Sequence, residues 1–155
     1  MTLPSASVPI REAVTGDLHR IAALIRALAE YERLTHEVTF DEPELGRWLF
    51  GPDPPAHATL ATEGDDEVVG LALWYVTFST FTGQPGIWLE DLFVLPEARA
   101  RGHGRALLEA LMQRTRGRLE WAVLDWNAPA IQFYERLGAR PVDGWTRYRW
   151  TGPPA

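Results

Sequence analysis

Residues 88–108 hold the feature that most constrains the fold: a strand-like run that leads through a glycine turn into an amphipathic helix. Arg99, Gly102 and Gly104 form an R-x-x-G-x-G pattern at this turn. Glycine lets the backbone approach a ligand closely because it has no Cβ. The helix that follows directs its unpaired N–H groups and its positive dipole end at the same spot. The segment therefore predicts a binding site for a phosphate or pyrophosphate.

The pattern alone is also typical of an ordinary helix-initiating turn with two conformational glycines. It is not a Walker loop, because no Gly-Lys-Ser/Thr sequence closes it. It is not a dinucleotide fingerprint either, because the full G-x-G-x-x-G is missing and the motif lies in the middle of the chain.

Hydrophobic periodicity predicts alternating strands and helices along the chain. The first helix opens at Asp17 and has apolar residues on one face, at Leu18, Ile21, Ala22, Ile25, Leu28 and Ala29. We expect strands at residues 8–13, 58–63, 68–78, 90–94, 118–125 and 145–150, and further helices at residues 42–50, 105–115 and 128–137. Residues 64–66 form a turn, and Gly138 caps the last helix. This order predicts an α/β fold with a mixed sheet and helices on both faces.

Composition limits the possible classes of function. The 155 residues are enough for one domain, which we place at residues 1–155. The net charge of −6 argues against a nucleic-acid binder and allows a cationic substrate. The absence of cysteine excludes disulfides, thiolate metal sites and a cysteine nucleophile, and the four histidines have no metal-ligand spacing. We see no signal peptide and no membrane span, so we expect a cytoplasmic protein.

A second motif begins at Asn127 and reads N-x-x-A-x-x-F-Y-x-x-x-G-A. Alone, its Tyr134 is typical of a core aromatic residue and its Asn127 of a helix N-cap. Together with the glycine turn, the motif resembles the GNAT superfamily of N-acetyltransferases, whose acetyl-CoA-binding motif is Q/R-x-x-G-x-G/A. The resemblance covers nearly the whole chain. It implies the GNAT fold, with a mostly antiparallel mixed sheet, and acetyl-CoA as cosubstrate.

Within this superfamily the chain is most similar to the spermidine/spermine (diamine) and thialysine acetyltransferase branch. Four segments carry this closer resemblance: residues 28–32, 89–91, 126–127 and 144–145. The resemblance implies that acidic and aromatic residues bind the amine, namely Tyr31, Glu32, Glu90, Asp91, Trp126 and Asp143. Arg33, Thr35 and His36 stand where mammalian-type enzymes carry further acids, which favours a small diamine or a lysine-like amino acid. Glu32 also fits an ordinary solvated helix face.

The resemblance also implies which residues contact the cosubstrate. They are Leu92, Phe93, Val94, Arg99, Ala100, Arg101, Gly102, His103, Gly104, Arg105, Ala106, Asn127, Ala130 and Tyr134. It further implies that Tyr134 donates a proton to the departing thiolate. Glu90 either accepts the proton of the amine or anchors the substrate cation, and both roles stay open. A backbone N–H of residues 92–94 is placed to hold the oxyanion.

We therefore expect an acetyl-CoA-dependent N-acetyltransferase that acts on a primary amine of a small cationic acceptor, which is a diamine, a polyamine or a lysine-like amino acid. Direct transfer in a ternary complex is expected because no cysteine is available for a covalent relay. The alternatives are a peptide or protein N-acetyltransferase and a non-catalytic acyl-CoA-binding sensor domain. The branch it resembles and the seven tryptophans favour a homodimer. We expect no nucleic-acid, membrane or metal partner.

Overall fold

The computed structural model describes residues 7–153 of the chain. The chain divides into two compact units, Met1–Ala122 and Val123–Ala155. The first unit contains the sheet and three α-helices, and the second contains one α-helix. No helix in the described part of the chain is both long enough and apolar enough to cross a bilayer.

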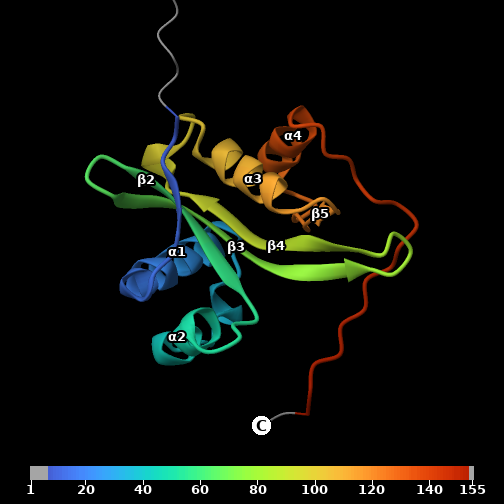
Figure 1. Ribbon diagram of the computed structural model, residues 1–155, viewed down its shortest axis with the longest axis horizontal. Helices are drawn as coiled ribbons and strands as arrows, with labels where there is room; N and C mark the ends of the chain where they lie inside the picture. Colours follow the sequence, from blue (N-terminus) through green and yellow to red (C-terminus); the bar gives the residue numbers. More distant parts are fainter. Residues whose placement is uncertain (1–6, 154–155) are drawn as a thin grey trace, which may run out of the picture. The chain divides into compact units, whose positions relative to one another are not determined.

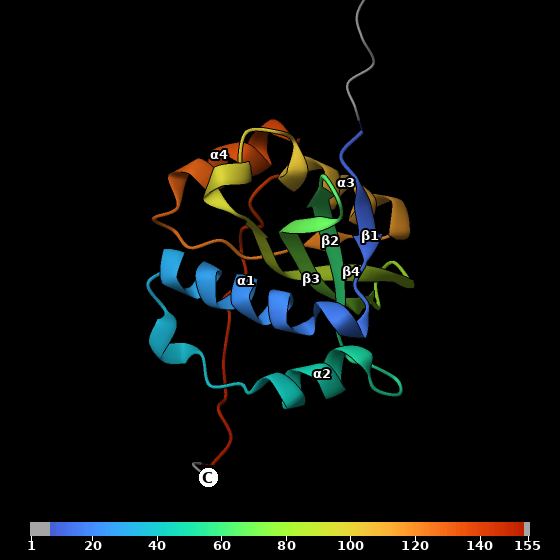
Figure 2. The same ribbon diagram turned by 90° about the vertical axis from the view of Figure 1, so that its left-hand side faces the viewer.

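The first unit is a five-stranded sheet with strand order β1-β2-β3-β4-β5. The β4–β5 pairing is parallel, and the other three pairings are antiparallel. Helices α1 and α2 cover one face of the sheet and α3 covers the other (Figures 1 and 2). The elements are β1 (Ile10–Glu12), α1 (Leu18–Tyr31), α2 (Glu42–Phe50), β2 (His57–Glu63), β3 (Glu67–Ser79), β4 (Gln84–Val94), α3 (His103–Arg114) and β5 (Leu119–Glu120). The predicted mixed, mostly antiparallel sheet is confirmed.

The hydrophobic core lies between α1 and the sheet. Ile21, Leu24 and Leu28 of α1 pack in one cluster with Leu71 of β3 and Phe93 of β4. Complete burial of such a side chain contributes about 1.5–3 kcal/mol each. This packing fixes the axis of α1, and so it fixes where the helix ends relative to β4.

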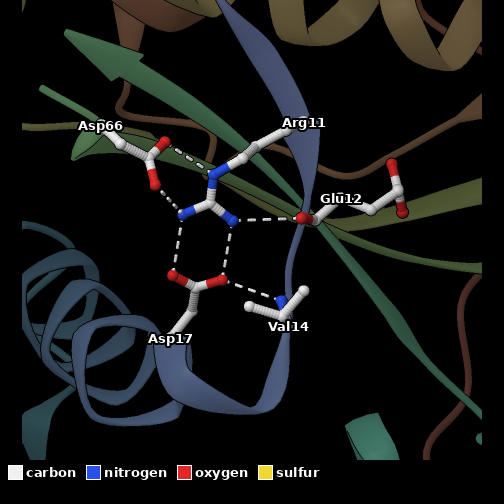
Figure 3. Close-up of polar contacts among 5 residues, drawn as sticks. All are labelled: Arg11, Glu12, Val14, Asp17 and Asp66. Atoms are coloured by element: carbon white, nitrogen blue, oxygen red, sulfur yellow. Dashed lines mark hydrogen bonds and ion pairs between the residues drawn. The ribbon is translucent and has the colours of Figure 1, made fainter. Parts of the chain in front are cut away.

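Arg11 of β1 ties the start of α1 to the turn between β2 and β3 (Figure 3). Its guanidinium donates to both carboxylate oxygens of Asp17, at 2.8 and 2.9 Å, and to both of Asp66, at 2.8 and 3.0 Å. The hydrogen bonds from Arg11 hold the pKa of Asp17 below its usual value. The Asp17 carboxylate therefore accepts hydrogen bonds from Arg11 and from the N–H of Val14. It makes no cap hydrogen bond to α1.

Several predicted boundaries need correction. The strand predicted at residues 118–125 is only Leu119–Glu120, because β5 pairs with β4 at two positions. The strand at residues 8–13 is also shorter than predicted, whereas β4 begins six residues before residue 90. Helix α3 begins at His103, two residues early, and ends at Arg114. The helix at residues 42–50 and the turn at residues 64–66 are confirmed.

The second unit contains α4 (Ala128–Arg136). The Asn127 side chain caps the helix by accepting from the N–H of Ala130 at 3.4 Å, so the N-cap role is confirmed. Gly138 follows in a left-handed conformation, φ 91°, as expected after a helix end. The strand predicted at residues 145–150 is wrong, because those residues pair with no strand in the described structure. Their aromatic side chains, Trp145, Tyr148 and Trp150, are exposed.

Candidate functional site

The glycine turn, residues 99–104, has an unusual backbone. Ala100 and Gly102 both have positive φ angles, 61° and 87°. Ala100 adopts this conformation at a cost, since a side chain disfavours it by about 1–2 kcal/mol. The N–H of Ala106 donates to the carbonyl of Gly102 at 2.9 Å. The N–H groups earlier in the first turn of α3 have no acceptor within the helix, so the turn is suited to bind an anion.

Glu63, at the end of β2, supports the glycine turn through hydrogen bonds from two of its side chains. Both of its carboxylate oxygens lie 2.8 Å from Nη1 of Arg101, and Oε1 lies 2.6 Å from Nε2 of His103. Because its partner is a carboxylate, Nε2 of His103 carries the proton and donates it. These hydrogen bonds, with that from His103 the largest cause, hold the pKa of Glu63 below its usual value. The sequence analysis missed Glu63, which lies 40 residues from His103 and belongs to no motif.

His103 is itself only 4% exposed. Its Nδ1 is buried and has no hydrogen-bond partner in the described part of the chain. A buried histidine at the first position of α3 therefore points into the fold and toward Glu63. Its side chain supports the turn, and its backbone N–H belongs to the open end of the helix.

Arg99 fastens the glycine turn to the end of β4 and to the end of α1. Its Nε donates to the carbonyl of Val94 at 2.9 Å. Its guanidinium carbon lies 5.3 Å from the ring centre of Tyr31 and 5.5 Å from that of Phe93, within cation–π distance. The predicted cosubstrate contact Arg99 and the predicted substrate contact Tyr31 are thus direct neighbours.

Strand β4 carries a bulge at Glu90. Leu73 of β3 pairs with Asp91 and the next residue, Trp74, pairs with Leu89, so Glu90 is left without an opposite residue. A bulge of this kind redirects side chains and is common beside active sites. The Glu90 side chain is exposed and accepts a hydrogen bond from Nε1 of Trp88 at 2.9 Å.

Asp91 lies with Glu90 and Glu32 in a group that we call the acid cluster. Burial raises the pKa of Asp91 to about 7, and the negative charges of Glu90 and Glu32 add to this rise. Burial also raises the pKa of Glu32. The structure thus brings together three of the predicted substrate contacts from the end of α1 and the middle of β4. Such a cluster favours a cation, because a positive charge relieves the repulsion among its carboxylates.

Beyond the bulge, β4 runs with one edge open. Its register with β5 consists of Ile87–Leu119 and Trp88–Glu120. Residues 92–94 therefore have no β5 partner in the first unit, while they still pair with β3. Residues 92–94 thus lie on a strand edge that β5 does not cover, between the glycine turn and the acid cluster.

Five of the predicted residues belong to the second unit. Tyr134 is partly buried, and its ring centre lies 5.4 Å from that of Phe133. Asn127 is 8% exposed. The others are Ala130, which is partly buried, and Trp126 and Asp143, which are exposed.

Comparison with known proteins identifies a family and relatives to which this chain is similar. Residues 21–139 match the model of the acetyltransferase (GNAT) family. The chain is 38% identical to a thialysine N-epsilon-acetyltransferase of Sus scrofa, over 95% of this chain and 94% of that protein. It is 29% identical to an L-ornithine N5-acetyltransferase of Arabidopsis thaliana, over 92% of this chain and 84% of that protein.

A solved structure has the same fold. An integron cassette protein from the mobile metagenome of V. cholerae superimposes with a TM-score of 0.74 at 25% identity. The match covers 94% of this chain and 93% of that one. The predicted fold class is confirmed by this similarity as well as by the sheet itself.

Proposed function

Because the chain belongs to the acetyltransferase (GNAT) family, we propose that it transfers the acetyl group of acetyl-CoA to the terminal amine of a lysine-like amino acid or a small diamine. The observation that carries this proposal is the acid cluster of Glu32, Glu90 and Asp91, which suits a small cationic acceptor. The names of the thialysine and ornithine acetyltransferase relatives support it.

Acetyl-CoA supplies an activated acetyl thioester, and we assign its binding to two backbone segments. The N–H groups of residues 101–105 bind the pyrophosphate, since they lie at the open end of α3. The open edge of residues 92–94 binds the extended arm and holds the negative charge that develops on the carbonyl oxygen. Asn127 and Ala130 complete the binding residues that the family motif implies. Trp126 and Asp143 remain proposed substrate contacts on the same basis.

The acceptor amine must lose a proton before it attacks. We propose Glu90 as the acceptor of this proton, directly or through a water, because the bulge exposes its carboxylate. A second candidate is Asp91, whose pKa of about 7 matches the pH at which a general base works best. The residue that does not take the proton anchors the ammonium group.

We propose Tyr134 as the donor of a proton to the departing sulfur. Tyr134→Phe keeps the ring and removes only the hydroxyl, so kcat should fall about 10²-fold. The melting temperature should stay nearly the same, because the packing is preserved. Tyr148→Phe, at a tyrosine of the same unit that is 90% exposed, is the matched control and should keep full activity. A fully active Tyr134→Phe enzyme would leave Tyr134 with a packing role alone.

An acceptor panel with CoA release as readout tests the function as a whole. It contains L-lysine, L-ornithine, thialysine, 1,5-diaminopentane and spermine. The amino acids and the diamine should have higher kcat/KM than spermine, because Arg33 follows Glu32 where a polycation would need a further acid. Spermine as the best acceptor would reverse this ranking. If no amine of the panel causes release of CoA, the proposal is refuted.

We also propose that residues 1–155 act as one acetyltransferase domain in the cytoplasm, where acetyl-CoA is available. The family match supports the single domain, because residues 21–139 run across both compact units.

We propose a homodimer in which Trp145 and its neighbours contact the partner. The exposure of Trp145, Tyr148 and Trp150, each above 80%, supports it, since exposed aromatic groups mark interaction surfaces. Light scattering that gives the 17.4 kDa monomer mass at micromolar concentration would contradict the dimer.

A further inference from the structure

A small cavity lies on the first unit, toward the turn end of the β3–β4 hairpin. Its volume is about 190 Å³, room for several water molecules. Phe78 and Trp88 supply apolar surface, and Arg118 and Glu120 supply one positive and one negative charge. No predicted site residue lies in this cavity, and it belongs to neither sequence motif.

The cavity is joined to the acid cluster through Trp88. Trp88 lines the cavity and donates its indole N–H to Glu90. It is also the register partner of Glu120 across the β4–β5 pair. Glu120 therefore lies level with Trp88, two residues along β4 from Glu90, which is a separation of roughly 6–7 Å along the strand.

Arg118 and Glu120 face each other without forming a hydrogen bond. Nη1 of Arg118 lies 3.8 Å from Oε1 of Glu120, which is too long for one. Both side chains are partly exposed, at 60% and 42%. The pair thus keeps donors and acceptors of both signs for a ligand that carries both charges.

We propose that this cavity binds the α-amino-acid head group of the acceptor. Arg118 holds the α-carboxylate and Glu120 the α-ammonium, while the aliphatic chain crosses Trp88 and the terminal amine reaches Glu90. The lengths agree, since the five bonds from Cα to the terminal nitrogen of a lysine-like amino acid span about 6 Å when extended. This inference rests on the proposed function and names its acceptor class: a basic α-amino acid rather than a diamine.

The approach of β5 to β4 places Arg118 at the cavity. A Cβ at Gly86 would come 2.6 Å from the backbone carbonyl of Arg118 and 3.0 Å from Oγ1 of Thr77. Only glycine at residue 86 lets the two strands come this close. The N–H of Ile87 then donates to the same carbonyl at 2.8 Å, which fixes the backbone of Arg118 at the cavity.

The test compares L-lysine with 1,5-diaminopentane, which is the same molecule without its carboxylate. Arg118→Gln should raise the KM for L-lysine about tenfold, because it removes a charge-assisted contact with the carboxylate. The KM for 1,5-diaminopentane should stay the same or fall, because the variant removes a positive charge near a dication. Glu120→Gln should raise both KM values, since both acceptors carry a second ammonium. Arg116→Gln, at an exposed arginine that does not line the cavity, is the matched control.

An equal change of both KM values in Arg118→Gln, or no change in either, would overturn the head-group site. So would a wild-type enzyme that acetylates 1,5-diaminopentane but no amino acid. These outcomes leave the proposed acetyltransferase function intact. Failure of the wild type to acetylate any amine refutes both that function and the head-group site.

Discussion

At the glycine turn, Glu63 accepts hydrogen bonds from Arg101 and His103, whereas in the acid cluster Asp91 lies beside two further carboxylates. The pKa of Glu63 is lowered as a result, and the pKa of Asp91 is raised to about 7. The two regions therefore prepare for their ligands differently. The turn pairs Arg101 and His103 with Glu63 and offers its backbone N–H groups to the anion. The acid cluster keeps negative charge that a cationic ligand can neutralise.

The glycine turn and the acid cluster also differ in their effect on stability. Pairing at the turn holds a strained backbone at Ala100 in place. Burial of like charges in the acid cluster opposes folding at neutral pH, because the folded chain resists the ionisation of Asp91. Substitutions at the turn should thus change the binding of acetyl-CoA. Substitutions in the acid cluster should change the binding of the amine and the pH dependence of rate and stability.

The largest effect is expected at the turn. Gly104→Val places a branched side chain where the pyrophosphate should lie against the backbone. Loss of two charge-assisted hydrogen bonds, each about 2 kcal/mol, should weaken acetyl-CoA binding about 10³-fold. Calorimetry measures this affinity, and circular dichroism checks that the fold is retained.

Gly16→Val is the matched control, because a Cβ at Gly16 would meet no atom within 4 Å. It should bind acetyl-CoA as the wild type does. If Gly104→Val also keeps its affinity, the pyrophosphate does not lie on the glycine turn, and the turn is not the anion-binding region.

Most helices and strands were predicted correctly because the residues that start, stop and pattern them are neighbours in the sequence. The helix at residues 42–50 is bounded by sequence, since Asp41 accepts from the N–H of Glu44 at 2.7 Å and Pro43 lies in the first turn. The glycine turn was likewise predicted from Arg99, Gly102 and Gly104. The strand at residues 145–150 failed for the opposite reason: alternation gives a strand its faces, but a sheet must also supply a partner.

The site was predicted only in part for the same reason. Glu32, Glu90 and Asp91 were expected from the family resemblance, but the bulge that leaves Glu90 unpaired is a matter of register between two strands. Glu63 and Arg118 depend on contacts between segments far apart in sequence. A histidine at the start of α3 with no acid nearby in sequence was the one hint of a distant carboxylate such as Glu63.

The next largest effect is expected at Asp91. If Asp91 accepts the amine proton, kcat/KM should rise with pH through about 7 in the wild type. Asp91→Asn should lose this inflection and about 10²-fold in rate. The folded chain retains the proton of Asp91 between about pH 4 and 7 while the unfolded chain loses it, so wild-type stability falls as pH rises through this range. At pH 8 the free energy of unfolding should therefore be about 4 kcal/mol higher for Asp91→Asn than for the wild type, and near pH 4 the two should be similar.

Glu32→Gln sharpens this test, because it removes one like charge and leaves Asp91 in place. The inflection should move to lower pH, and the KM for a diamine should rise about tenfold through loss of a charge-assisted contact. If the inflection stays in Asp91→Asn and disappears in Glu90→Gln, then Glu90 is the base and Asp91 the anchor.

The smallest effect is expected at Glu63, which braces the turn without meeting the ligand. Glu63→Gln keeps the shape of the side chain but replaces the carboxylate by a neutral amide with one accepting oxygen. The hydrogen bonds from Arg101 and His103 should weaken, so the turn should hold its geometry less firmly. The KM for acetyl-CoA should rise about fivefold, while kcat and the KM for the amine stay unchanged. Initial-rate kinetics with each substrate varied in turn separate these constants. Glu67→Gln, at an exposed glutamate that is the register partner of Glu63 across the β2–β3 pair, is the matched control and should change none of them. An increase in the amine KM as large as that for acetyl-CoA would mean that Glu63 supports the fold as a whole, and the division of labour between the two regions would not hold.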